Sequence, residues 1–456
     1  MSGQLKTKLA SIGAGRVSAR LESKIIGGGL TSMGVRMTGV GLGFISQVLL
    51  SRMLGASDFG TYSVLISWSL LIVVPVKFGL DLTTLKFAAG YWAEQNFRSV
   101  NALAVSGAKA LCITIPLAGL GIFAVNFVVP GLFGSANLPD LALMALMFGI
   151  LGMIGILSQF FRAAQMIFYS QFFEQVLRSV FLIGLLLGIA YLGLPFTTTD
   201  ALAMAASAAG LALAAMLLTF FLKIWASGAG MSVDAGERAQ WLRVSWPLFG
   251  AAIAGQALNQ MSVIVLGAMA PDTAAGQFAA AVRLAAFVTF ALAALNSITA
   301  PMIAAAFKRD DKDELNKIAT INARIASIAG LGICGVFAVF GKMVLGLFGP
   351  EFPAAYPALL VLLVGTFCGA ATGPVGFFLS MTNQQRFFLW SSIGCVLFTL
   401  GVTVWAVSAY GLLGAAIGAA TGQVALNLSR WYVVRKRLGI DASFVGLPTR
   451  VVATQS

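Results

Sequence analysis

Long apolar runs, each of about 20 residues or more, alternate along the chain with short segments that hold most of the charges. A helix that crosses the ~30 Å hydrocarbon core needs about 20 mostly apolar residues, because its backbone must satisfy its own hydrogen bonds where water is absent. The pattern therefore predicts an all-α polytopic membrane protein with about twelve transmembrane helices. The predicted spans are 30–50, 61–80, 100–128, 140–161, 173–193, 201–223, 244–268, 276–303, 318–348, 357–381, 387–409 and 412–434.

The chain also repeats itself at an offset of about 215 residues. "GLFGSANLPDLAL" begins at Gly131 and "GLFGPEFPAAYPAL" at Gly346, and "LGASDFGTY" at Leu54 has its counterpart in "LGAMAPDTAAGQF" at Leu266. Each half then holds six spans, and an even number gives both halves the same orientation in the membrane. The repeat predicts two parallel six-helix bundles around a central cleft, an arrangement typical of transporters.

The expected organisation has five parts. A basic cytoplasmic N-terminus (1–24) precedes an N-terminal bundle (25–223), a basic, turn-rich cytoplasmic linker (224–243), a C-terminal bundle (244–437) and a cytoplasmic tail (438–456). The first apolar run is too long for a cleaved signal peptide, so it is expected to be a retained span.

Lysine and arginine fall mostly on one side of this predicted topology. If the N-terminus is cytoplasmic, 24 of the 29 lie in inside segments, and only Arg52 and Lys342 lie in outside segments. The positive-inside rule therefore predicts that both termini are cytoplasmic. The net charge of +13 then reflects topology and attraction to the anionic inner leaflet of the lipid bilayer, so no nucleic acid partner is expected.

Arg36 stands alone in a run that has no other charge between Lys24 and Arg52. Twelve residues from Lys24 at ~1.5 Å per residue place it some 18 Å deep, where an arginine needs water, an acceptor or an anion. Helical spacing puts it on a face of small or polar side chains, namely Gly29, Ser32, Gly39, Gly43 and Gln47. This face suits a cavity wall, although the glycines alone would also allow close helix contact.

The other cations are less isolated. Arg283 is predicted near the outer end of the eighth span, where it is either an interfacial anchor or a ligand. Arg52 at the outer end of the first span favours a headgroup contact, and Lys109 is expected to snorkel to the inner interface. Arg36, Arg52 and Arg283 are kept as candidate cavity residues.

Amide side chains form a second group of candidates. Gln256, Asn259 and Gln260 share one face of the seventh span, opposite Gln47 if the repeat offset is applied. Such amides are either interhelical hydrogen-bonding groups or binders of hydroxyl groups along the cleft.

Acidic residues are absent from the middle of every predicted span. Lys77 with Asp81 and Glu174 with Arg178 are four residues apart, so each pair is expected to neutralise itself near the cytoplasmic side. Export of cations usually requires a deep carboxylate or a histidine relay, and the chain has no histidine. The passenger is therefore predicted to be negative, and phosphate is the group that arginine forks recognise best.

Metal and cofactor sites are not predicted. The four cysteines lie far apart within apolar spans, where thiols usually fill small gaps in the core. External loops are short, so an enzyme is not expected, although a lone external aspartate could serve a membrane glycosyltransferase.

Six stretches resemble the Wzx-type polysaccharide flippases of the multidrug/oligosaccharidyl-lipid/polysaccharide exporter superfamily, over about residues 25–437. They are "SRMLGASDFGTYS" (51–63), "GLDLTTLKFAA" (79–89), "GQFAAAVRLA" (276–285), "LFGPEFPAAYPAL" (347–359), "GPVGFFLSMTNQQRFFL" (373–389) and "YGLLGAAIGAA" (410–420). The resemblance implies a protein of the bacterial inner membrane that moves polyprenyl-pyrophosphate-linked oligosaccharide units from the cytoplasmic to the periplasmic leaflet for polysaccharide biosynthesis. It also implies basic cavity residues that receive the pyrophosphate, and a polysaccharide polymerase and chain-length machinery as partners.

Relatives often carry an arginine and an aspartate in the seventh span, where this chain has "NQMS" (259–262), so ion coupling through that span is not expected. An interior-negative potential alone could drive an anionic headgroup outward. The alternatives are a drug or cation antiporter of the same superfamily, and a scaffold of the polysaccharide assembly complex.

Overall fold

The computed structural model describes residues 2–225, 235–309, 312–381, 385–441 and 443–444 of the 456-residue chain. Regular structure within these ranges is helical throughout. The N-terminal lobe comprises α1 (Ser2–Lys77), α2 (Leu80–Ala93), α3 (Phe97–Val128), α4 (Leu138–Ala163), α5 (Ile167–Gln171), the π-helix η1 (Phe172–Leu177), α6 (Arg178–Leu192) and α7 (Thr198–Lys223). The C-terminal lobe comprises α8 (Ala235–Met269), α9 (Asp272–Lys308), α10 (Lys312–Gly346), the 3-10 helix η2 (Phe352–Ala355), α11 (Tyr356–Ala371), α12 (Val375–Met381) and α13 (Gln385–Leu438).

Two of these helices are long enough to cross a membrane twice. Ten segments of the described chain have the length and hydropathy of a membrane span, and Met33–Lys77 and Phe387–Arg437 contain 45 and 51 residues. Each bends at a glycine with positive φ, Gly55 (φ 73°) in α1 and Gly411 (φ 55°) in α13. Glycine adopts this backbone conformation without a steric penalty. Counting both halves of each gives twelve crossings, which confirms the predicted all-α membrane fold.

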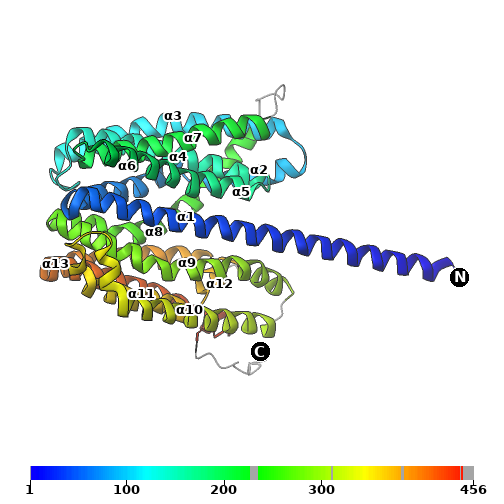
Figure 1. Ribbon diagram of the computed structural model, residues 1–456. Coiled ribbons are helices and arrows are strands. Elements are labelled where there is room, and N and C mark those ends of the chain that lie inside the picture. The colour runs from blue at the N-terminus through cyan, green and yellow to red at the C-terminus, as the bar shows by residue number, and fades with distance from the viewer. Residues whose placement is uncertain (1, 226–234, 310–311, 382–384, 442, 445–456) are drawn as a thin grey trace.

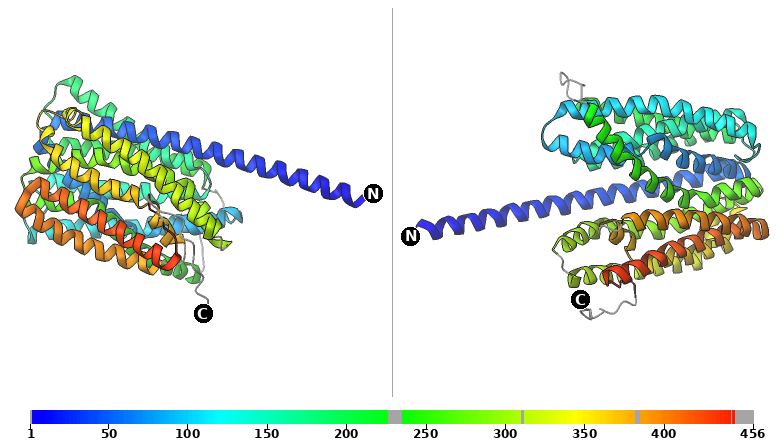
Figure 2. Two further views of the ribbon diagram at one scale, coloured as in Figure 1. Left: turned by 90° about the horizontal axis from the view of Figure 1, so that it is seen from below. Right: turned by 180° about the vertical axis from the view of Figure 1, so that it is seen from behind.

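The helices form two lobes with α1 lying between them (Figure 1). α1 packs against α4 of its own lobe and against α8 and α9 of the other. The first part of α1 projects well beyond the lobes, and α8 crosses obliquely from one lobe to the other, as seen from behind in Figure 2. We call the two ends of the bundle the Gly55 end, where α1 bends, and the linker end, where α7 ends and α8 begins.

Side chains and backbone join the two lobes at the Gly55 end. Ser51 Oγ donates to the carbonyl of Phe348 (3.0 Å), and the backbone N–H of Ala56 donates to Glu351 Oε2 (3.0 Å). The fully buried ring of Phe59 packs near that of Phe348, with 6.5 Å between ring centroids. Polar and apolar contacts together therefore seal this end.

At the linker end the lobes meet through α2 and α8. The hydroxyls of Thr83 and Ser245 are 2.8 Å apart, and Trp241 Nε1 donates to the hydroxyl of Tyr91 (3.2 Å). α2 is a short helix that the hydropathy pattern did not predict, because its 14 residues are too few for a crossing.

Several predicted boundaries shift. The fifth span begins at Ile167 rather than at residue 173, and it includes α5, η1 and α6. α8 begins at Ala235, so helix already covers the end of the predicted linker 224–243, while residues 226–234 lie outside the described part. Residues 2–24 belong to α1, and residues 445–456 of the predicted tail also lie outside the described part.

Candidate functional site

A cavity of about 540 Å³ lies between α1 and the helices around it, and its lining comes from both lobes. Three of the lining residues are arginines, one each from α1, α6 and α9: Arg36, Arg178 and Arg283. Neutral polar side chains make up much of the rest, including Gln47, Tyr62, Gln175 and Gln260. The sequence placed Arg36, Arg283, Gln47 and Gln260 among the candidates, and the structure brings these four to one cavity.

Arg178 is the functional candidate that sequence reasoning missed. Its expected pairing with Glu174 is wrong, because the Glu174 carboxylate lies 3.3 Å from the guanidinium of Arg162 instead. Arg162 is further held by a hydrogen bond from its Nε to Ser170 Oγ (3.0 Å). Arg162 therefore neutralises the Glu174 carboxylate. Arg178, which does not pair with Glu174, lines the cavity.

The position of Arg178 within its span also differs from the expectation. The span runs from Ile167 to Leu192, so Arg178 lies 11 residues, or roughly 16 Å, from the linker end, near its middle. Glu174 likewise lies seven residues into this span rather than at its end. The π-helix η1 ends at Leu177, directly before Arg178, and such segments often occur at functional sites.

Arg283 lies deeper than the sequence suggested. α9 begins at Asp272, so Arg283 is 11 residues, or roughly 16 Å, from the Gly55 end rather than about seven residues. Its guanidinium donates to Ser63 Oγ (3.3 Å) and stacks over the ring of Phe59 at 4.8 Å from the centroid. These contacts from the second half of α1 fix the Arg283 side chain. The hydrogen bond to Ser63 uses only one of the five guanidinium N–H donors, so the others can serve a ligand in the cavity.

Arg36 lies closer to the linker end than predicted. α1 is continuous up to its bend, and the 19 residues between Arg36 and Gly55 correspond to about 28 Å, nearly the thickness of the hydrocarbon core. The glycines that share its face serve packing as well as the cavity. A Cβ on Gly39 would lie 2.7 Å from Gln175 Cβ, and one on Gly43 would lie 4.0 Å from Ser179 Oγ.

The neutral side chains complete the lining. Tyr62 is buried and lines the same cavity as the two deep arginines, Arg178 and Arg283. The amide oxygen of Gln47 is buried and has no hydrogen-bond partner among the described residues. An unpaired buried acceptor costs free energy unless a water or a ligand group donates to it.

The charge balance of this cavity is its main chemical property. Among the described residues that line it there are three arginines and neither aspartate nor glutamate. Cations within a membrane are costly unless water, an acceptor or an anion compensates them. Guanidinium forks bind phosphate and carboxylate oxygens in pairs, so the cavity is suited to a multiply charged anion.

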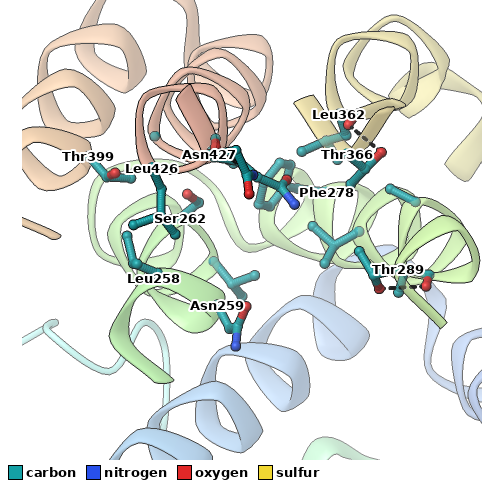
Figure 3. Close-up of a pocket in the computed structure, with 17 residues that line it drawn as sticks. Leu258, Asn259, Ser262, Phe278, Thr289, Leu362, Thr366, Thr399, Leu426 and Asn427 are labelled. Carbon is teal, nitrogen blue, oxygen red and sulfur yellow. Dashed lines mark hydrogen bonds between the residues drawn. The ribbon is translucent and has the colours of Figure 1, made fainter. Parts of the chain in front are cut away.

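Three of the candidates lie elsewhere. Arg52 is exposed, and its Nε donates to the carbonyl of Leu347 (2.6 Å) at the Gly55 end. Gln256 is half-buried on α8 and does not line the arginine-containing cavity. Asn259 lines a second, neutral cavity of about 320 Å³ in the C-terminal lobe (Figure 3).

Metal-binding groups are not found in the described ranges, where no three His, Cys, Asp or Glu side chains come together. The four cysteines are free. Cys112 is exposed on α3, so the expectation of a buried thiol was wrong at that position.

Comparisons with known proteins agree with this geometry. Residues 26–307 match the family described as "Polysaccharide biosynthesis protein". The structure is similar to the inward-facing conformation of a multidrug resistance MATE family transporter of the MOP superfamily, with a TM-score of 0.71, 16% identity and coverage of 90% of this chain and 98% of that chain. The outward-facing conformation of a MATE transporter gives a TM-score of 0.56 at 16% identity, covering 90% of this chain and 95% of that chain.

A mutant of the Vibrio cholerae MATE transporter VcmN matches with a TM-score of 0.64 and 15% identity, covering 92% of this chain and 98% of that chain. No protein of curated function matches the chain by sequence. Identities this low establish a shared fold and no more.

Proposed function

Because this chain belongs to the polysaccharide biosynthesis protein family and has the fold of MATE transporters of the MOP superfamily, we propose that it is a lipid-linked oligosaccharide flippase. It moves polyprenyl-pyrophosphate-linked oligosaccharide units from the cytoplasmic to the periplasmic leaflet of the bacterial inner membrane. The mechanism is alternating access through the cationic cavity, with the two lobes rocking about α1.

The observation that carries this proposal is the arginine-lined cavity with no acidic group among its described lining residues. A polyprenyl-pyrophosphate headgroup is a dianion with many acceptor oxygens. Each guanidinium group can donate two parallel hydrogen bonds to it, so two or three arginines can bind it together. Arg178 and Arg283 sit near the middle of their spans, so they offer this binding at the depth where an unpaired phosphate would be most costly. The three guanidinium groups would repel a cationic drug there.

The three arginines lie at different depths. In the proposed orientation the linker end is cytoplasmic, which places Arg36 at the cytoplasmic mouth of the cavity and Arg178 and Arg283 farther in. The diphosphate is received first by Arg36 and then transferred to the deeper pair. The sealed Gly55 end faces the periplasm, in keeping with the greater similarity to the inward-facing transporter.

Membrane potential supplies a driving force for this cycle. An interior-negative potential favours outward movement of each negative charge by about 2.3 kcal/mol per 100 mV, and it favours return of the empty cationic cavity toward the cytoplasm. No coupling ion is therefore required. The polyprenyl tail remains in the bilayer while the sugars cross in the polar cleft.

A leaflet-sidedness assay tests the proposal. Purified full-length protein is reconstituted in proteoliposomes with a fluorescent polyprenyl-diphosphate disaccharide in one leaflet, and its appearance in the other leaflet is followed with a membrane-impermeant quencher. We expect time-dependent transfer that empty liposomes lack and that the double variant Arg178→Ala/Arg283→Ala loses. Lys109→Ala, a change at an exposed lysine on α3, is the control. Transport of a cationic dye without any transfer of the lipid probe would overturn the proposal in favour of drug efflux.

A further inference from the structure

The second cavity differs in chemistry from the cationic one. Its lining from α8, α9, α11 and α13 contains no charged residue among the described positions. Figure 3 shows side chains from these four helices pointing toward a common space. Seven of them are neutral and polar: Asn259, Ser262, Thr289, Thr366, Thr399, Gln423 and Asn427.

Two hydroxyls in this lining have no partner among the described residues. Ser262 Oγ and Thr399 Oγ1 are buried and make no hydrogen bond, and their residues are only 5% and 1% exposed. They come from two different helices, α8 and α13, and both are labelled in Figure 3. Buried polar groups are nearly always paired with protein, water or ligand. Both residues line the cavity, so their unpaired hydroxyls lie in the wall against which a bound hydrogen-bonding group would pack.

Some of the remaining polar side chains are held in place by hydrogen bonds to their own helices. Asn427 Nδ2 donates to the carbonyl of Gln423 (2.9 Å), and Thr366 Oγ1 donates to the carbonyl of Leu362 (3.0 Å). Apolar side chains, including Phe278, fill the walls between them. A mixture of amide, hydroxyl and apolar surface with no charge matches a sugar ring, which presents hydroxyls at its edge and C–H groups on its faces.

The two cavities are direct neighbours. Ala286 on α9 lines both of them. Two consecutive pairs of residues are also divided between them, because Asn259 and Val282 line the neutral cavity while Gln260 and Arg283 line the cationic one. A sugar attached to an anion at Arg283 would therefore start beside the wall that the two cavities share.

We infer that the neutral cavity is a saccharide subsite that holds the sugar joined directly to the diphosphate. This inference rests on the proposed function and adds where the carbohydrate is recognised. The volume of about 320 Å³ is at the lower end of the range for pockets that hold small organic ligands, about 300–1,000 Å³. The subsite accordingly takes a single ring or a small number of rings, and more distant sugars lie in the cleft.

Binding to the full-length protein in nanodiscs tests the inference with defined probes. The probes are a short-chain prenyl diphosphate that carries a methyl cap in place of the sugar, so that its charge matches (the bare diphosphate), and the same lipid carrying glucose, galactose, mannose or N-acetylglucosamine. We expect every probe to bind and at least one glycosylated probe to bind roughly tenfold more tightly than the bare diphosphate. Ser262→Ala and Thr399→Val should each reduce this sugar-dependent gain by roughly twofold to tenfold, while affinity for the bare probe stays unchanged.

Thr403→Val is the matched control. Thr403 lies one turn from Thr399 on α13 and also has a buried hydroxyl without a partner in the described part of the chain, but it does not line the cavity. Its substitution should leave both affinities unchanged. The comparison separates loss of a sugar contact from any general effect of removing an orphan hydroxyl.

The possible failures are distinguishable. The saccharide subsite is refuted if the bare diphosphate binds and an attached sugar does not increase the affinity. It is also refuted if Ser262→Ala and Thr399→Val leave the sugar-dependent increase in affinity unchanged. The proposed function stands in both cases. If these variants change only a sodium dependence of binding, the cavity is a cation site instead. If no diphosphate binds at all, both proposals fall.

Discussion

Gly60 and Gly276 face each other across the boundary between the two lobes. A Cβ on Gly60 would lie 1.9 Å from the carbonyl oxygen of Asp272 and 2.9 Å from the backbone nitrogen of Gly276. A Cβ on Gly276 would lie 2.1 Å from the carbonyl oxygen of Ala56 and 3.0 Å from the backbone nitrogen of Gly60. Both Gly60 with Gly276 and Ala56 with Asp272 are 216 residues apart, so the contact is reciprocal and follows the internal repeat.

The first prediction concerns this contact. Gly60→Ala and Gly276→Ala should each force the backbones apart at the Gly55 end, at a cost of about 1–3 kcal/mol to the closed arrangement. The population with this end open should rise by roughly fivefold to 150-fold. Spin labels on the two lobes near Gly55, read by double electron–electron resonance, measure the shift.

Gly41→Ala is the control for this experiment, because a Cβ at Gly41, which lies in α1 like Gly60, would meet no atom of the described chain within 4 Å. If the distances between the spin labels stay unchanged in both Gly60→Ala and Gly276→Ala, the contact between these glycines does not hold the closed state.

The second prediction concerns Arg178. Arg178→Ala should slow transfer of the lipid-linked probe by roughly tenfold to 150-fold, since a hydrogen bond to a charged group contributes about 1.5–3 kcal/mol. Arg178→Lys should recover part of the rate, because it keeps the charge but not the paired geometry of the guanidinium. Initial rates in the leaflet-sidedness assay measure both effects. Arg52→Ala, outside the cavity, should leave probe affinity unchanged, whereas Arg178→Ala should lower it. An equal loss of probe affinity in both variants would contradict the assignment.

The third prediction concerns the ion pair that neutralises Glu174. Arg162→Leu should free the Glu174 carboxylate to compete with the anionic ligand near Arg178, which lowers probe affinity. Both partners are 37% exposed, so the effect should be modest, about twofold to fivefold. The double variant Arg162→Leu/Glu174→Gln should restore affinity. A double variant as weak as Arg162→Leu alone would mean that Arg162 acts in another way.

The fourth prediction concerns pH and Asp441, beyond the last span. Partial burial raises the pKa of its carboxyl, but hydrogen bonds from Ser443 and Trp431 outweigh this, so the net pKa lies below the ordinary value. Trp431 Nε1 and Ser443 Oγ are 3.1 Å and 2.7 Å from Asp441 Oδ1. Because the folded pKa is depressed, the contact contributes fully above the ordinary carboxyl pKa of about 4 and is lost as pH falls through the folded value.

Hydrogen exchange at residues 431–444 should therefore stay unchanged from pH 7 to pH 5, after correction for intrinsic rates, and accelerate only below about pH 4. Asp441→Asn should show faster exchange at pH 7 already. Loss of protection between pH 7 and pH 5 would contradict the depressed pKa.

The fifth prediction concerns the membrane potential. A potassium diffusion potential, negative on the side where the probe starts, should accelerate transfer of the dianionic lipid, because each charge gains about 2.3 kcal/mol per 100 mV. The reverse potential should slow it. A rate that does not change with the sign of the potential, but does change with a pH or sodium gradient, would assign the driving force to ion coupling.

The sequence by itself determined the membrane fold, the number of crossings and the internal repeat. These properties depend on where apolar runs begin and end and on glycines such as Gly55, which are local features that remain legible in a linear chain. Arg36 and Arg283 were also identifiable, because a charge within an apolar run is conspicuous without any knowledge of its neighbours.

Only the tertiary structure decided which side chains share a cavity. Arg178 looked neutralised by Glu174, since the two residues are one helical turn apart, but Arg162 from another helix pairs with that acid instead. Asn259 and Gln260 are adjacent in sequence yet line different cavities. Ion pairing and cavity lining depend on the distances between helices that are far apart in the chain, and hydrophobic periodicity holds no information about those distances.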